Sequence, residues 1–125
     1  NNIINIFLPD NKLRKQIMSI QTDSLGLEEP KDHETCNVYQ IYNLLATKDQ
    51  SEALANKYRT GNFGYGHAKQ ELFDLICSKF ATERAKFTFL MSNTDIIEKE
   101  LISGASKAKV IANNVLRRVR ENIGY

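Results

Sequence analysis

The chain has 125 residues, of which 42% are hydrophobic and 26% charged, and its formal net charge is +2 at pH 7. This length suits one domain with a modest core, and the composition is ordinary for a soluble globular protein. No apolar run is long enough to cross a membrane, and the apolar start lacks the basic flank of a signal peptide. We therefore expect a cytoplasmic protein with no membrane partner.

The first third of the chain is predicted to hold one helix and one long loop. Residues 2–7 could form a short strand, because Ile4 and Ile6 alternate with polar positions. A helix opens at Pro9-Asp10 and ends near Thr22, with an apolar stripe of Leu13, Ile17 and Ile20. Residues 22–34 are polar and contain helix breakers, which predicts a loop.

Three helices are predicted in the middle of the chain. Thr35 or Asn37 caps the first, and the second begins at Asp49 or Ser51 and ends at Gly61. The third is predicted to be the longest and to run over about residues 65–91. Their apolar positions are Val38, Ile41, Tyr42, Leu45, Leu54, Tyr58, Ala68, Leu72, Leu75, Ile76, Phe80, Phe87 and Leu90.

The last third is predicted to hold two helices that Gly104 separates. Asn93 or Thr94 caps the first of them. The second has an apolar stripe of Ala108, Ala112, Val115, Val119 and Ile123. The periodicity therefore predicts an all-α bundle of five or six helices.

Few side chains in the sequence suit catalysis or metal binding. Cys36 and Cys77 are too far apart for a C-x-x-C pair, so we interpret both as small buried hydrophobic residues. His33 and His67 add too few ligands for a zinc site, and no metal is expected. No nucleophile elbow, zinc-protease motif or Walker lysine occurs, so no catalytic residue is predicted.

Residues 61–69 concentrate three glycines, two aromatic residues, His67 and Lys69 at the start of a predicted helix. Glycines alone could explain a tight corner between two helices. Lys69, however, lies in a first turn, where the helix dipole favours anions, so a negative group should come to it. Aromatic rings beside a cation suit a contact to single-stranded RNA, and the purely structural alternative remains equally open.

Charge is distributed unevenly along the chain. Residues 1–34 contain four basic and six acidic residues, a net charge of −2, whereas residues 101–125 contain five basic and one acidic residue, a net charge of +4. The basic end offers possible phosphate contacts at Lys107, Arg117 and Arg118. A solvated helix face is the alternative interpretation of this cluster.

Four blocks of sequence resemble bacterial tryptophanyl-tRNA synthetases in the same order. One block is Gly64-Tyr65-Gly66-His67-Ala68-Lys69-Gln70-Glu71-Leu72. The others lie in residues 20–32, 36–42 and 118–125. The resemblance implies the anticodon-binding, C-terminal helical domain of this class I synthetase family over residues 9–125. It also implies that residues 1–8 are the end of the catalytic domain that follows the KMSKS loop.

The resemblance further implies the role of the chain in an intact enzyme. Such an enzyme joins L-tryptophan to tRNA(Trp) with ATP and Mg²⁺, is a homodimer, and is catalytic in a domain outside this chain. The chain alone would bind the anticodon arm and would hold no cofactor. The residues that the resemblance implies as contacts to the anticodon are Thr22, Asp23, Ser24, His67 and Lys69.

Physical chemistry permits these roles and also permits simpler ones. Asp23 could accept a hydrogen bond from a cytosine N4 amino group, and Lys69 could donate to a base carbonyl or a phosphate. Alternatively, Asp23 is a turn residue that binds its own backbone, and His67 only caps a helix. A helical protein-interaction or oligomerisation module without RNA binding is the alternative function.

Overall fold

The computed structural model describes residues 3–124, and the part of the chain that it describes is entirely helical apart from loops. The predicted all-α class is confirmed. The helices are α1 (Asp10–Met18), α2 (Asn37–Leu45), α3 (Lys48–Thr60), α4 (Tyr65–Lys79), α5 (Ala81–Ser92) and α6 (Thr94–Ile123). The chain divides into two compact units, Asn1–Arg84 and Ala85–Tyr125, which are described separately below.

The short strand expected in residues 2–7 does not form in residues 3–7, and Asn2 lies outside the described residues. A strand needs a partner for its backbone groups. Here the side chain of Gln16 takes that place: its Oε1 accepts from the Asn5 N–H at 3.0 Å and its Nε2 donates to the Ile3 carbonyl at 2.6 Å. The segment before α1 is therefore held by a helix side chain.

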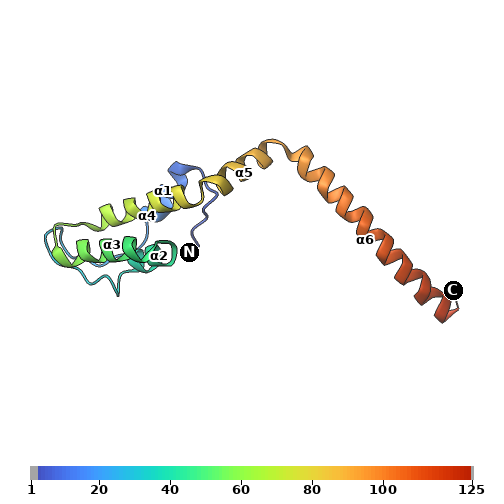
Figure 1. The fold of residues 1–125 in the computed structure, drawn as a ribbon, viewed down its shortest axis with the longest axis horizontal. Helices are drawn as coiled ribbons and strands as arrows, with labels where there is room; N and C mark the ends of the chain where they lie inside the picture. Colours follow the sequence, from blue (N-terminus) through green and yellow to red (C-terminus); the bar gives the residue numbers. More distant parts are fainter. Residues whose placement is uncertain (1–2, 125) are drawn as a thin grey trace. The chain divides into compact units, whose positions relative to one another are not determined.

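Helix α4 is the centre of the first unit. It packs against α1 and α2, and α2 also packs against α3 (Figure 1, blue to yellow). The buried core comes from all four helices and the residue before α2: Leu13, Ile17, Cys36, Val38, Tyr42, Leu54, Tyr58, Ala68, Leu72 and Ile76. The predicted apolar stripes of α1 to α4 are thus the faces that meet in this core.

Two lysines of α4 hold the ends of its neighbours. Lys69 Nζ donates to the carbonyl of Met18, the last residue of α1, at 3.1 Å. Lys79 Nζ donates to the carbonyl of Leu45, the last residue of α2, at 2.6 Å. The last carbonyls of a helix lack intrahelical partners and carry partial negative charge, so both lysines stabilise helix ends.

Two of the predicted helix starts differ from the structure by one residue. Helix α2 follows Cys36, whose backbone is extended, rather than Thr35 or Asn37. Helix α3 starts earlier than Asp49, because Thr47 forms a capping box with Gln50. Thr47 Oγ1 accepts from the Gln50 N–H at 3.3 Å, and the Gln50 side chain accepts from the Thr47 N–H at 2.9 Å.

Three other predicted boundaries were wrong. Helix α1 ends at Met18, before Thr22. The helix expected over residues 65–91 is two helices, because the backbone of Phe80 (φ −107°, ψ 21°) interrupts it. Gly104 breaks nothing: α6 runs through it for 30 residues, since one glycine costs a helix only about 1 kcal/mol.

The second unit contains the end of α5 and all of α6. Asn93 is the residue before α6, but its side chain makes no hydrogen bond to the start of the helix and instead donates to the Phe89 carbonyl at 2.8 Å. No residue of α6 is buried. None of the described helices is both long enough and apolar enough to span a membrane.

Candidate nucleic-acid interface

Asp23 lies in the loop between α1 and α2, and it forms a local turn. Its Oδ1 accepts from the Leu25 N–H at 3.1 Å, as the simpler sequence interpretation proposed. Asp23 and Ser24 are exposed, whereas Thr22 is half-buried. Within the described residues, the backbone N–H groups of residues 21–24 donate to no protein acceptor. This short stretch therefore offers both donors and acceptors to a ligand.

Lys31 anchors the same loop from inside. Only 4% of its surface is exposed. Its Nζ donates to the carbonyls of Gly26 at 2.6 Å and Glu29 at 2.8 Å, with a longer contact of 3.4 Å to Leu27. A buried ammonium is expensive unless its donors are satisfied, and the loop backbone satisfies them here.

The loop packs closely against the corner between α3 and α4, residues 61–64. Gly61 has φ +75°, and a Cβ there would lie 2.5 Å from the Glu28 carbonyl oxygen. A Cβ at Gly64 would lie 3.0 Å from Leu27 Cδ1. The Lys31 N–H donates to the Tyr58 carbonyl at 2.8 Å. Glycine is therefore required at position 61 both by conformation and by the approach of the loop.

Tyr65, the first residue of α4, connects Lys31 with Asp23. The Lys31 ammonium lies 5.5 Å from the centre of the Tyr65 ring, within the range of a cation–π contact. Burial, and then the Asp23 carboxylate, raise the pKa of the Tyr65 hydroxyl well above its ordinary value. That hydroxyl is buried and has no partner at ordinary hydrogen-bond geometry, although Asp23 is close enough to affect it.

The structure gives Lys69 and His67 structural partners. Lys69 is the fifth residue of α4 and so lies beyond the first turn in which it was predicted. It is half-buried, and its ammonium meets the partial negative charge at the end of α1. His67 is exposed, and its Nδ1 accepts from the Gly64 N–H at 3.4 Å, which is a weak helix cap. Its ring lies 5.8 Å from that of Phe63. Lys69 holds Met18, which is only four positions before Thr22. Only a short segment therefore separates the residue that Lys69 holds from the Asp23 turn.

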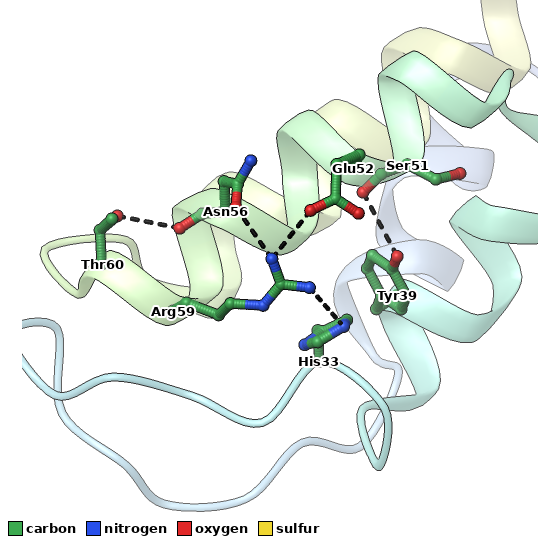
Figure 2. Close-up of polar contacts among 7 residues, drawn as sticks. All are labelled: His33, Tyr39, Ser51, Glu52, Asn56, Arg59 and Thr60. Carbon is green, nitrogen blue, oxygen red and sulfur yellow. Dashed lines mark hydrogen bonds and ion pairs between the residues drawn. The ribbon is translucent and has the colours of Figure 1, made fainter.

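The other end of the loop is fixed to α3 by a polar network (Figure 2). Arg59 donates to Glu52 at 2.8 Å and Asn56 at 2.9 Å, and its guanidinium also contacts His33 Nε2 at 3.4 Å. The His33 ring meets Tyr39 edge-on at 4.8 Å. The second half of the loop is thus attached to the helices by Lys31 and by this network.

Asp32 forms a second turn beside this network. Its Oδ1 accepts from the Glu34 N–H and its Oδ2 from the Thr35 hydroxyl, both at 2.9 Å. These hydrogen bonds favour the charged carboxylate and lower its pKa.

The basic positions Lys107, Arg117 and Arg118 all lie exposed on α6, in the second unit. Within the described residues, no three His, Cys, Asp or Glu side chains form a group that could hold a metal ion. Cys36 is buried and its Sγ lies 3.4 Å from Tyr58 Oη, whereas Cys77 is half-buried; neither is in a disulfide.

Sequence reasoning missed Lys31, the most deeply anchored charged residue of the site. One signal was present: a lysine directly after Pro30, in a loop rich in carboxylates and glycine. Nothing in that pattern says that the ammonium turns inward to the loop carbonyls.

Comparisons with known proteins agree with the family resemblance. The tryptophan–tRNA ligase of Fusobacterium nucleatum is 43% identical over 124 residues, which are 99% of this chain and 38% of that protein. The ligase of Campylobacter jejuni strain RM1221 is 39% identical over 123 residues, 98% of this chain and 39% of that protein. The chain is homologous to part of tryptophan–tRNA ligases. No family model matches it.

Solved tryptophanyl-tRNA synthetases also share its fold. A crystal structure of the Campylobacter jejuni enzyme has a TM-score of 0.92 at 39% identity, covering 99% of this chain and 40% of that one. A second, complexed with ADP and tryptophan, has a TM-score of 0.93 at the same identity and covers 39% of that chain. The chain therefore spans about two fifths of the length of the ligases that it matches.

Proposed function

We propose that this chain is the tRNA-recognition part of a tryptophan–tRNA ligase and that it receives the anticodon arm of tRNA(Trp). The observation that carries the proposal is the exposed Asp23 turn, in a loop that packs against the corner between α3 and α4 in a homologue of these ligases. Residues 1–8 would connect this helical part, residues 9–125, to the catalytic domain.

The same proposal covers the intact enzyme. It would join L-tryptophan to tRNA(Trp) with ATP and Mg²⁺, in the cytoplasm and as a homodimer, with its catalytic residues outside this chain. This chain would itself hold no cofactor.

Recognition would use groups that suit unstacked bases. One oxygen of Asp23 accepts from Leu25, and the other can accept from a cytosine amino group. The hydroxyls of Thr22 and Ser24 can donate or accept. An ammonium has three donors, so Lys69 can reach a base or phosphate while it holds Met18. His67, exposed beside Phe63, can stack on a base.

Backbone phosphates would be bound elsewhere. Lys107, Arg117 and Arg118 are exposed on α6 and are the proposed phosphate contacts. Such contacts carry no sequence information, and they make affinity fall as salt is added.

Asp23→Asn tests the reading of the anticodon within the full-length protein that carries this chain. Asparagine keeps the oxygen that accepts from Leu25 and removes the negative charge, so the turn should persist. We expect discrimination at one anticodon position to weaken by about 1–3 kcal/mol. Binding of tRNA(Trp) and of transcripts with single anticodon substitutions would be measured by filter binding.

Asp49→Asn is the matched control, because Asp49 is also an exposed aspartate but lies in the first turn of α3. It should leave anticodon discrimination unchanged. If Asp23→Asn reduced the affinity for every transcript equally, Asp23 would not be a base-reading residue.

A protein-interaction module remains a second candidate, because α6 exposes many large apolar side chains. They are Ile96, Leu101, Ile102, Val110, Ile111, Val115, Leu116, Val119 and Ile123. A partner bound through such a surface would respond little to salt, whereas tRNA binding should weaken steeply. Salt titration of tRNA binding distinguishes the two functions.

A further inference from the structure

Lys31 makes an unusual set of contacts for a lysine in a loop. It is almost fully buried, although lysine is among the residues least often buried, and its ammonium faces main-chain carbonyls instead of a carboxylate. No ion pair involving Lys31 is present among the described residues. Its donors therefore define the path of the loop backbone between Gly26 and Glu29.

The loop is also in direct contact with the helix corner. The Glu28 carbonyl approaches Gly61 so closely that no Cβ fits between them, and Leu27 lies against Gly64. The Lys31 N–H is fixed to Tyr58, one of the largest fully buried residues of the core. A displacement of residues 26–31 would thus break contacts with both α3 and the start of α4.

A chain of contacts leads from Lys31 to Asp23. The ammonium lies over the Tyr65 ring, and the Tyr65 hydroxyl is near enough to Asp23 for that carboxylate to affect it. Gly26, which accepts from Lys31, is only three residues after Asp23. Lys31 therefore restrains Asp23 along the loop backbone, and it also lies over the ring whose hydroxyl is affected by Asp23.

We propose that Lys31 is the positioning residue for Asp23: it holds the loop in one conformation before RNA binds, so that Asp23 reads a base without a prior ordering step. This inference rests on the proposed function. A preorganised reader binds more tightly and more selectively than a loop that must become ordered on binding. The Asp23 turn would accordingly keep the same conformation in the free and tRNA-bound protein.

The test is Lys31→Met in the full-length protein. Methionine keeps most of the side-chain length and removes the three donors and the charge. We expect the preference for tRNA(Trp) over a transcript with one substituted anticodon base to fall about tenfold, at the base that Asp23→Asn affects. Hydrogen exchange of the amides of residues 25, 26 and 31, which donate hydrogen bonds in the loop, should become faster, while the amides of α4 remain protected.

Lys57→Met is the matched control. Lys57 also lies over an aromatic ring of this corner, 5.6 Å from the centre of Phe63, but it pairs with Glu71 and touches no loop carbonyl. It should change neither discrimination nor exchange in the loop.

The double variant Lys31→Met, Asp23→Asn separates positioning from general stability. If Lys31 acts through Asp23, the double variant should discriminate no worse than Asp23→Asn alone. Losses that simply add, or unchanged discrimination in Lys31→Met, would overturn the inference and leave the proposed function intact. If Asp23→Asn itself has no effect on discrimination, the reading role of Asp23 fails, and the positioning role with it.

Tyr65→Phe covers the case in which Lys31→Met does not fold. It keeps the ring under Lys31 and removes the hydroxyl beside Asp23. A loss of discrimination of about threefold or more at the same base supports the inference, and wild-type discrimination overturns it. Circular dichroism shows whether each variant folds. If Lys31→Met does not fold, the result with Tyr65→Phe decides.

Discussion

Gly61→Ala is expected to destabilise the first unit by about 2–6 kcal/mol. At φ +75° and ψ −173°, the backbone of Gly61 lies in a region that only glycine occupies readily, which costs other residues about 1–3 kcal/mol. The new methyl group would also lie 2.5 Å from the Glu28 carbonyl oxygen, and relieving such an overlap costs about 1–3 kcal/mol. The carbonyl cannot retreat freely, because Lys31 holds the loop on both sides of it.

Urea unfolding followed by circular dichroism measures this effect, with Gly66→Ala as the control. A Cβ at Gly66 meets nothing within 4 Å, and Gly66 lies inside α4, so alanine there should be neutral or stabilising by up to about 1 kcal/mol. If Gly61→Ala had a midpoint within error of the wild-type value, the loop would not be in contact with this corner.

Other perturbations test separate parts of the fold. Gly104→Ala should stabilise α6 by about 1 kcal/mol, seen as greater helicity on heating, because a Cβ there also meets nothing; lower helicity would indicate a real break. Thr47→Ala should destabilise the first unit by about 1 kcal/mol in urea through loss of the cap of α3, and an unchanged midpoint would contradict that role. Burial raises the pKa of the Tyr58 hydroxyl far above its ordinary value of 10.0. The contribution of the neutral hydroxyl to the free energy of unfolding is therefore complete below pH 10, and it is lost as the pH rises further. Alkaline titration should therefore show tyrosinate absorbance rising together with loss of helicity, and ionisation of all five tyrosines in a folded chain would refute this.

Sequence periodicity predicted the helices of the first unit well because their apolar stripes all face one core. Leu13, Tyr42, Tyr58 and Leu72 were placed on stripes from spacing alone, and all four are buried. The break at Phe80 could not be predicted in this way, since neither glycine nor proline marks it. It depends on tertiary contacts: Phe80 packs against the core, and Arg84, one turn later, binds the Ile6 carbonyl and Asp10.

The candidate site was predictable only in part, for a similar reason. Glycine spacing identified the corner at Gly61, and turn chemistry identified Asp23 as a residue that binds its own backbone. The partner of Lys69 lies 51 positions away in the chain, so a local argument about the dipole of α4 could not find it. Lys31 was missed because its partners, although close in sequence, are main-chain carbonyls, and a pattern of side chains does not show how the loop backbone turns toward the ammonium.

The lysines that hold helix ends and the loop reduce the positive charge that is available to bind a polyanion. Lys31, Lys69 and Lys79 all direct their ammonium groups at main-chain carbonyls, so the 17 basic residues of the chain are not equivalent. A cation already engaged in this way gathers fewer phosphates and displaces fewer condensed counterions. If the chain binds RNA as proposed, the number of ions released should therefore be smaller than a count of lysines and arginines suggests, and neutralising Lys31 or Lys79 should alter the architecture more than the salt dependence.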